Sequence, residues 1–377
     1  MKYVAYYDTP ENKAENRSYQ LSAVNKINYV CAVLNRLGHD VQIVSASVTE
    51  NRKGCKGKNV PLFDRTTLKL LPCLGMGSPP KRVLRRILAR IRLLWELVFC
   101  TRKGEPVLVY HALAYAGTIA LARKCKNFRL ILEVEEIYAD VSGNERDRSW
   151  EFRLFDVADA FLFPTELLNE KVNTRRKPYV ISHGTYQVEP DRGCRRFRDG
   201  KIHCVYAGTF DPRKGGAMAA AAAAEFLPEN YHMHILGFGS DEEVAAMQDM
   251  IRTLSDRCAC AVSYDGLLSG EDYIRFLQSC DIGLSTQNPE AAFNATSFPS
   301  KILSYMASGL QVVSIRIPAV EGSGIGDRVY YYDHQTPEEI AQAILSIPKS
   351  GREDPRKTIE SLNTGFERVM EELLSNG

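Results

Sequence analysis

The sequence predicts an α/β protein with two doubly wound parallel sheets, each in its own domain. Strand-like and helix-like segments alternate through residues 2–182, and the alternation restarts at Lys201 after a polar, aperiodic stretch at 187–200. Such alternation is typical of parallel sheets covered by helices. The chain has 377 residues, and that length suits about two domains.

Composition indicates a folded chain with ample core and gives no global charge signal. Hydrophobic residues make up 45% and the formal net charge is +2, so nucleic-acid binding is not expected, and no nucleic-acid-binding module is recognised. The ten cysteines form no CxxC pair, and Cys258-x-Cys260 lacks a further ligand at zinc-site spacing, so we expect reduced thiols and no metal site.

The first residues resemble a strand rather than a signal peptide. No apolar run approaches the ~20 residues that cross a bilayer. We therefore expect a cytoplasmic protein, which leaves contact with a membrane surface open.

The first domain is expected to open as a βαβ unit: a strand at 2–7, a helix at 18–37 ended by Gly38, and a strand at 41–46. Residues 50–80 show no clear period and are expected to leave the sheet. Further strands are expected at 107–110, 129–134, 159–163 and 179–182.

Residues 81–99 are predicted to form a basic amphipathic helix. Its apolar residues recur at helical spacing and its cations fall mostly on the other side: Leu84, Ile87, Leu88, Ile91, Leu94, Trp95 and Val98 against Lys81, Arg82, Arg85, Arg86, Arg90 and Arg92. Such a helix can lie on an anionic membrane. Alternatively, its apolar stripe packs on the sheet and its arginines are solvated. Both interpretations stay open.

The second half repeats the pattern. Strands are expected at 201–207, 231–236, 261–264, 281–285 and 310–314, and helices at 217–224, from 241, at 272–279, within 294–309, at 337–347 and at 355–374.

Two loops at the ends of these strands suit a diphosphate. The loop 208–216 offers Gly208 for close backbone approach and Arg213 and Lys214 as cations. Gly237-x-Gly239 also permits close approach, although a GxG after a strand is often only a tight turn. A Walker motif and a first-turn GxGxxG are both missing from the sequence, which argues against an ATPase or a dinucleotide dehydrogenase.

A third phosphate candidate is the stretch 294–309, NATSFPSKILSYMASG. Asn294, Thr296 and Ser297 can cap a helix start. Ser300 and Lys301 would then lie at its positive end, where phosphates bind. An ordinary buried helix with a good cap is the alternative.

Taken in order, these segments resemble the retaining glycosyltransferases of family 4 (group 1), over about residues 201–347. The resemblance rests on YAG at 206–208 with Lys214-Gly215, LGFG at 236–239, YDGLLS and CDIGL within 264–284, and FPSKILSYMASG at 298–309. The last segment is similar to a form found in many polysaccharide-assembly members. The first half matches only in outline.

The resemblance implies the GT-B fold, in which two Rossmann-like doubly wound domains face each other across a cleft. Residues 1–190 would form the N-terminal acceptor-side domain and 191–354 the nucleotide-sugar-binding domain. Residues 355–377 would form a helix that packs back on the first domain.

The resemblance also implies a metal-independent hexosyltransferase without a cofactor. It would move a sugar from a UDP- or GDP-type nucleotide diphosphate sugar, with retention, to a glycan or polyprenyl-linked acceptor in cell-surface polysaccharide (capsule) synthesis. The helix at 81–99 suggests peripheral contact with the inner membrane face. A homo-oligomer is compatible with the sequence.

The motif assigns binding roles by position. Gly208, Arg213 and Lys214 would bind the diphosphate, with Ser300 and Lys301 beside it; Gly237 and Gly239 would approach the nucleotide, and Gly266 and Leu267 would lie near the base.

The catalytic candidates are His111 and Thr296. His111 would face the transferred sugar, or else be a core histidine. Many members carry two glutamates eight positions apart, and here those positions fall near Thr296 and Ser304, neither of which is acidic. Glu133, Glu135 and Glu136 would be acceptor-side carboxylates or a solvated loop.

Two alternatives remain at this point. The missing glutamates favour a non-catalytic GT-B-like subunit that activates a partner transferase. A nucleotide-sugar epimerase of the same fold is the other, although its denser set of acidic and histidine residues is not found in the sequence.

Overall fold

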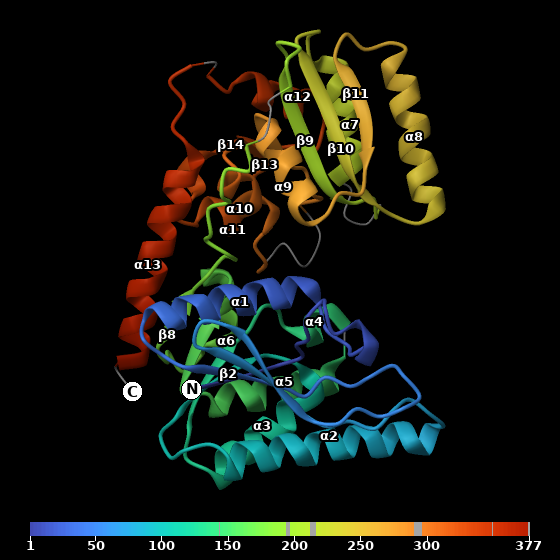
Figure 1. The fold of residues 1–377 in the computed structure, drawn as a ribbon. Helices are drawn as coiled ribbons and strands as arrows, with labels where there is room; N and C mark the ends of the chain where they lie inside the picture. Colours follow the sequence, from blue (N-terminus) through green and yellow to red (C-terminus); the bar gives the residue numbers. More distant parts are fainter. Residues whose placement is uncertain (143, 194–196, 212–215, 290–295, 349, 376–377) are drawn as a thin grey trace. The chain divides into compact units, whose positions relative to one another are not determined.

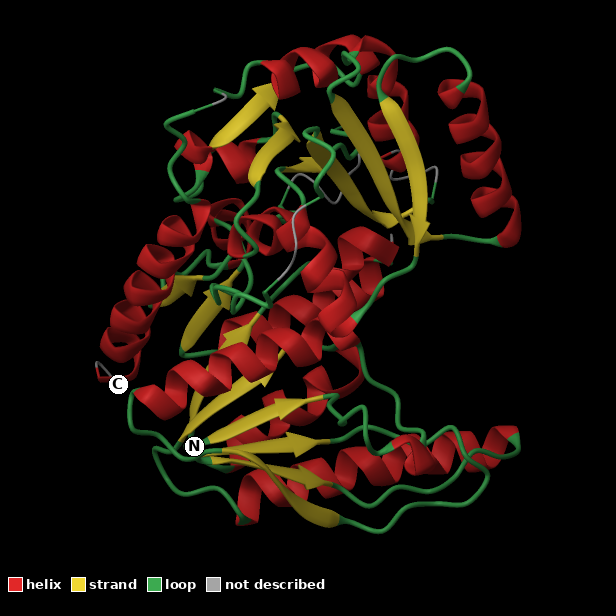
Figure 2. Ribbon diagram, turned by 45° about the horizontal axis from the view of Figure 1, so that its top comes forward, coloured by secondary structure: helices red, strands yellow, loops and turns green. Residues whose placement is uncertain are grey.

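Two separate sheets organise the chain in the computed structural model, which describes residues 1–142, 144–193, 197–211, 216–289, 296–348 and 350–375. Each sheet belongs to its own unit. The first unit comprises Met1–Ser182 with Gly365–Gly377, and the second comprises His183–Thr364. Both sheets are covered by helices (Figures 1 and 2).

The first sheet has eight strands in the order β3-β4-β2-β1-β5-β6-β7-β8. Neighbouring strands are parallel except β3 and β4. The strand bounds are β1 Lys2–Ala5, β2 Val41–Ser45, β3 Lys58–Phe63, β4 Thr66–Leu70, β5 Pro106–Tyr110, β6 Arg129–Glu133, β7 Ala160–Phe163 and β8 Tyr179–Ile181.

The helices of the first unit lie on both faces of this sheet, with α1 on one face and α2 and α3 on the other (Figure 1). Their bounds are α1 Leu21–Arg36, α2 Pro79–Phe99, α3 Leu113–Cys125, α4 Tyr138–Ser142, α5 Glu145–Val157 and α6 Glu166–Val172, with a 3₁₀ turn at Lys13–Glu15. Apolar strand residues such as Val107 and Leu130 are fully buried between the layers.

The expectation that residues 50–80 leave the sheet is wrong in part, because β3 and β4 extend it. The chain reverses at Asp64, whose φ of 36° is left-handed. In β4, Leu68 and Leu70 are buried on alternate positions. Of the three buried positions in this five-residue strand, only two are apolar, because the first is Thr66. Two apolar residues are too few to stand out as a period in the sequence.

The second sheet has six parallel strands in the order β11-β10-β9-β12-β13-β14. The strands are β9 Ile202–Thr209, β10 Tyr231–Phe238, β11 Ala261–Gly266, β12 Ile282–Ser285, β13 Gln311–Ile315 and β14 Val329–Tyr332. The helices are α7 Gly216–Ala222, α8 Asp241–Ser255, α9 Gly270–Ser279, α10 Lys301–Ala307, α11 Pro318–Glu321 and α12 Pro337–Leu345, with 3₁₀ turns at Ala223–Phe226 and Gly326–Arg328.

The last helix, α13 (Pro355–Ser375), begins in the second unit and ends in the first. Within the first unit, the Arg129 guanidinium donates to the carbonyls of Leu373 and Leu374 at 2.5 and 3.0 Å. The Tyr29 and Phe366 rings stack with centroids 5.6 Å apart. These contacts fix the final turns of the chain to the first unit.

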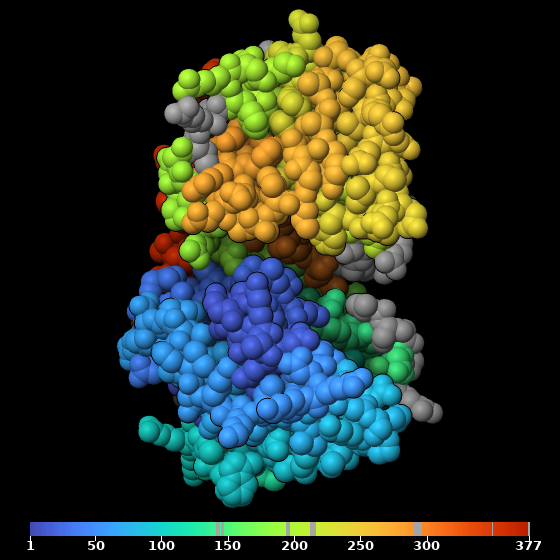
Figure 3. Space-filling model, turned by 45° about the vertical axis from the view of Figure 1, so that its right-hand side comes forward, coloured from blue at the N-terminus to red at the C-terminus, as the bar shows by residue number. Residues whose placement is uncertain are grey.

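The side of helix α2 that packs on the first unit is not the apolar stripe predicted from the sequence. Leu93 and Leu97 are buried together with Glu96, which accepts from Lys2 and Lys69 at 3.0 and 2.6 Å. Six other apolar residues of the helix are 47–65% exposed: Val83, Leu84, Ile87, Ile91, Trp95 and Phe99. The interpretation in which the apolar stripe packs on the sheet is therefore wrong for the stripe residues Leu84, Ile87, Ile91 and Trp95, which are exposed. Figure 3 shows the segment that contains α2, in light blue to cyan, at the surface of the first unit.

Two switch points position the candidate sites. The strand order reverses between β1 and β5 in the first sheet and between β9 and β12 in the second. Ligands of open α/β sheets bind at the carboxyl ends of strands at such points. None of the helices among the described residues is long and apolar enough to cross a membrane.

Candidate functional site

At the switch point of the second unit, Lys301, Tyr206 and Gly208 lie together. The Lys301 Nζ is 4.0 Å from the centroid of the Tyr206 ring. A Cβ added to Gly208 would lie 3.0 Å from that Nζ and 2.9 Å from the Tyr206 Oη. The ring face attracts the ammonium electrostatically, so the cation is held beside the backbone of Gly208.

Helix α10 sets the position of Lys301. Tyr305 lies four residues later on the same helical face, and its hydroxyl accepts the Ala207 N–H at 2.9 Å. The Tyr305 ring fills the space at Gly283, where an added Cβ would lie 2.3 Å from its Cγ. The helix is therefore anchored to β9 and β12 one turn after Lys301.

Side-chain hydrogen bonds reach the described residues on either side of 212–215. The Tyr206 hydroxyl donates to the Thr209 carbonyl at 3.1 Å, and the Thr286 hydroxyl donates to the Gly216 carbonyl at 2.5 Å. A Cβ on Gly216 would lie 2.9 Å from the Tyr206 ring. Arg213 and Lys214, the predicted diphosphate cations, lie outside the described residues.

At Gly237 and Gly239, neighbouring atoms leave no room for a side chain. A Cβ on Gly237 would lie 1.8 Å from the Gly208 carbonyl oxygen, and the Gly237 φ is 153°. A Cβ on Gly239 would lie 2.5 Å from Glu243, which forms a capping box with Ser240 at the start of α8. The close approach thus involves neighbouring strands and a helix cap, and nucleotide contact at these positions stays a prediction.

Gly266 and Leu267 lie at the end of β11. Gly266 pairs with Leu236 in the strand register, and Gly208 pairs with Gly237, so the ends of β9, β10 and β11 form a row. Gly266 has a φ of 78° with open space where a Cβ would be, and Leu267 is 64% exposed. An exposed leucine beside an open glycine suits contact with a flat ring.

Ser300 and Thr296 precede α10. Ser300 is the N-cap and is exposed, and its side chain makes no capping hydrogen bond. Thr296 is half-buried, and Asn294 lies outside the described residues. The expectation that Thr296 or Ser297 caps the helix is wrong, because α10 begins only at Lys301 and spans seven residues.

Ser304 lies at the second of the two positions where the resemblance leads one to expect a glutamate. Burial raises the pKa of the nearby Tyr273 hydroxyl, and a hydrogen bond with Ser304 acts in the opposite direction. Ser304 therefore makes a contact with Tyr273 inside the second unit.

In the first unit, His111 follows β5 at the switch point and is 1% exposed. Neither ring nitrogen has a hydrogen-bond partner among the described residues, and Nε2 lies 3.5 Å from Glu151 Oε1. Burial lowers the pKa of His111 to about 3, so the ring is neutral near pH 7. The carboxylate of Glu151 accepts the N–H groups of Tyr138 and Ala139 at 2.8 and 3.1 Å.

A cavity of about 230 Å³ opens beside His111. Its walls are rich in tyrosine: Tyr6, Tyr19, Tyr110, Tyr115 and Tyr138, with Ser18, Gln20, Ala23, Val48 and Ala112. Aromatic faces combined with hydroxyl groups are suited to polyols. The sequence analysis did not single out these tyrosines. Tyr6 directly after β1 and Tyr110 at the end of β5 were the available signal.

Glu133 is fully buried, so the solvated-loop interpretation is wrong for it. It accepts from the Tyr3 hydroxyl, and Lys26 Nζ lies 3.6 Å from its Oε1. Burial, with the neighbouring Glu135 charge, raises the pKa of Glu133 well above its usual range. Lys26 also pairs with Glu135, which is only partly buried. The Glu133 carboxyl is thus an internal group rather than one that faces an acceptor.

The predicted site residues therefore form separate groups. Gly208, Lys301 and Gly237 lie together, and Gly266 ends the neighbouring row of strands. His111 belongs to the first unit and Thr296 to the second. Tyr206 and Thr286 contact this group in the structure and were not proposed as site residues from the sequence. Tyr206 belongs to the YAG motif at 206–208, and Thr286 directly follows the apolar strand β12, which was its only signal.

Both the sequence and the structure of this chain were compared with known proteins. Residues 201–349 match the family described as glycosyl transferases group 1. No curated protein sequence matches the chain.

Solved structures match the whole chain. Sucrose-phosphate synthase from Thermosynechococcus elongatus has a TM-score of 0.68 at 12% identity, with 100% of this chain and 98% of that chain covered. A trehalose-6-phosphate structure from E. coli, bound with UDP-2-fluoro glucose, has a TM-score of 0.64 at 11% identity, with 100% and 98% covered. The catalytic domain of starch synthase IV from Arabidopsis thaliana, bound to ADP and acarbose, has a TM-score of 0.64 at 9% identity, with 99% of both chains covered.

Proposed function

We propose that this chain, a glycosyltransferase with the GT-B fold and a group 1 domain over residues 201–349, transfers a hexosyl residue from a UDP- or GDP-type sugar to a lipid-linked glycan acceptor. The proposal includes retention of anomeric configuration and the absence of a metal or other cofactor from the reaction. It also includes a role in cell-surface polysaccharide assembly.

The observation that carries the donor half is the Lys301 ammonium held over Tyr206 beside Gly208. Loss of a nucleoside diphosphate leaves negative charge on the departing oxygens. A preorganised cation and exposed backbone N–H groups stabilise that charge as it develops. Arg213 and Lys214 would supply further positive charge from the same loop, and Ser300 a hydroxyl beside Lys301.

The neutral ring of His111 supports a role on the acceptor side. Because burial keeps its pKa near 3, the ring would act at neutral pH as a hydrogen-bond donor and acceptor rather than as a cation. Its cavity wall is lined by tyrosines. We therefore assign His111 to the recognition of a sugar hydroxyl.

Peripheral contact with an anionic membrane is the third part of the proposal. Its support is α2, which has six exposed apolar residues next to exposed cations, Lys81, Arg82, Arg86 and Arg90. None of these four cations pairs with a carboxylate among the described residues. A helix with this composition binds the interface of anionic lipid.

Thermal unfolding with a panel of UDP-, GDP- and dTDP-sugars, without added metal, tests the donor assignment. A ligand at a hundredfold excess over its Kd stabilises the folded state by about 2.7 kcal/mol. We expect one nucleotide class to raise the melting temperature, and Lys301→Ala and Lys214→Ala to abolish most of that rise. Lys357→Ala, an exposed lysine of α13 in the same unit, is the matched control.

A non-catalytic subunit that activates a partner transferase is the second candidate. It is favoured by the absence of acidic residues at Thr296 and Ser304. If no nucleotide sugar raised the melting temperature, this second function would replace the first.

A further inference from the structure

Three adjoining cavities in the first unit lead from the exposed face of α2 to His111. The outer cavity has about 540 Å³, the middle one about 220 Å³ and the inner one about 230 Å³. Arg90 and Ala114 line both the outer and the middle cavity. Tyr6, Val48 and Tyr115 line both the middle and the inner cavity. The shared walls make the three cavities one series.

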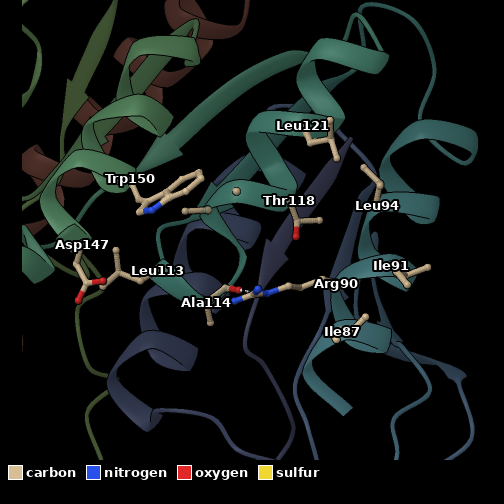
Figure 4. Close-up of a pocket in the computed structure, with 12 residues that line it drawn as sticks. Ile87, Arg90, Ile91, Leu94, Leu113, Ala114, Thr118, Leu121, Asp147 and Trp150 are labelled. Carbon is tan, nitrogen blue, oxygen red and sulfur yellow. Dashed lines mark hydrogen bonds between the residues drawn. The ribbon is translucent and has the colours of Figure 1, made fainter. Parts of the chain in front are cut away.

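The outer cavity is mostly apolar, with Asp147 and Thr118 also in its wall, and lies between α2, α3 and α5. Figure 4 shows Trp150 reaching in from α5, across from the α2 residues Ile91 and Leu94. Trp150, Ile91 and Leu121 are 56%, 53% and 48% exposed. Exposed apolar side chains around a hollow of this size indicate a site for an apolar ligand.

The middle cavity carries positive charge. Arg85, Arg86 and Arg90 line it, and neither Arg86 nor Arg90 pairs with a carboxylate among the described residues. The Arg90 Nε donates to the Ala114 carbonyl at 3.0 Å, which holds its guanidinium where the outer and middle cavities meet (Figure 4). Both arginines act on the Tyr6 hydroxyl, opposing the burial that raises its pKa. Guanidinium groups placed this way suit phosphate oxygens.

The inner cavity is the tyrosine-lined one beside His111, with hydroxyl groups and ring faces on its walls. Tyr6 and Tyr115, which line both the inner and the middle cavity, have ring centroids 5.1 Å apart. The order along the series is therefore apolar, cationic and then aromatic with hydroxyls.

We infer that the first unit binds one amphiphilic acceptor along this series. Its long apolar chain would occupy the α2–α3–α5 cavity, its phosphate or diphosphate would lie at Arg86 and Arg90, and its sugar would enter the tyrosine-lined cavity. The inference rests on the proposed function, since a transferase must present its acceptor at a strand-end site. The inference goes beyond the proposed function because it names the phosphate that links lipid and sugar as the group that fixes the position of the acceptor along the three cavities.

The chain offers a direct probe, since its two tryptophans are Trp95 and Trp150. In a Trp95→Phe background, fluorescence reports on Trp150 alone, at the wall of the outer cavity. Farnesyl diphosphate, farnesol and inorganic pyrophosphate would be titrated separately, below the micelle concentration.

We expect saturable blue-shifted emission with farnesyl diphosphate, and about tenfold weaker binding of farnesol, as the loss of charge-assisted hydrogen bonds predicts. Arg86→Gln/Arg90→Gln should weaken farnesyl diphosphate to about the farnesol affinity. The single Arg86→Gln variant is the control for misfolding, because the Arg86 side chain makes no hydrogen bond among the described residues. Lys103→Gln/Lys124→Gln removes two exposed charges of the same unit away from the series, and should leave binding unchanged.

Equal affinity for farnesol and farnesyl diphosphate would overturn the inference, as would the absence of saturation. Tight binding of pyrophosphate that matches farnesyl diphosphate would also overturn it, by showing a free-phosphate site. The nucleotide-dependent rise in melting temperature, measured on the same variants, separates the two proposals. If it persists while prenyl binding fails, the inference alone is wrong; if it is absent while prenyl binding holds, the donor assignment is wrong.

Discussion

The ammonium nitrogen of Lys301 lies 4.0 Å from the centroid of the Tyr206 ring, at the carboxyl end of β9. The two residues are far apart in the chain, and they meet because Tyr305 fixes α10 against Ala207. A cation held on an aromatic face keeps its charge in place before the donor arrives, which is the condition for electrostatic stabilisation of a leaving group.

Replacing the Tyr206 ring should weaken the donor site without removing its charge. A cation–π contact contributes about 1 kcal/mol, so we expect Tyr206→Leu to weaken nucleotide-sugar binding by about fivefold. Calorimetric titration with the nucleotide that stabilises the protein measures this. Tyr206→Phe keeps the ring and loses only the hydrogen bond to Thr209; a loss as large in this variant would contradict the cation–π explanation.

Gly237→Ala should unfold the second unit far more readily than Gly266→Ala. The added methyl group at Gly237 would lie 1.8 Å from the Gly208 carbonyl oxygen, whereas the space at Gly266 is open. Gly266 has a left-handed φ of 78°, which costs an alanine about 1 kcal/mol. Urea unfolding would compare the two variants, and similar stabilities would show that the close strand approach is easily relieved.

Because the folded state disfavours protonation of His111, the free energy of unfolding should fall in mild acid. Its pKa is about 3 in the folded state and 6.5 ordinarily, so the unfolded chain binds its proton first. The contribution of neutral His111 to the free energy of unfolding is complete above pH 6.5. It is lost as the pH falls below that value, by up to about 1.4 kcal/mol per pH unit. His111→Asn should flatten this slope in urea unfolding between pH 7 and pH 5. An unchanged slope would show that His111 is not the residue responsible.

Charge reversal on α2 should abolish binding to anionic vesicles. Each cation near such a surface contributes about 1 kcal/mol, so Arg82→Glu/Arg86→Glu/Arg90→Glu should lose co-sedimentation with phosphatidylglycerol vesicles. Phosphatidylcholine vesicles should bind the wild type weakly, and salt should reduce binding.

The matched control for that experiment is Lys103→Glu/Lys124→Glu/Lys171→Glu, which reverses three exposed charges elsewhere in the first unit. We expect it to bind like the wild type. Equal vesicle binding by the α2 variant would end the membrane proposal.

Much of the fold could be predicted from the sequence, because the spacing of apolar residues differs between strands and helices and depends only on local structure. The GT-B prediction is confirmed by structures that match the whole chain, and the group 1 resemblance by the match over residues 201–349. Gly208 and Lys301 were proposed from local signals, a glycine after a strand and a lysine at a helix start; they lie together in the structure, and their role in binding stays a prediction.

Tertiary structure decided what those signals left open. The sequence predicts an apolar side and a mostly opposite cationic side on α2, but the buried residues of the helix include Glu96, which pairs with Lys2 and Lys69, partners distant in sequence. Tyr206 and the tyrosines around His111 became site residues only because strands distant in sequence neighbour each other at the switch points. Periodicity records which residues share a face of one element, but which element covers that face depends on long-range packing.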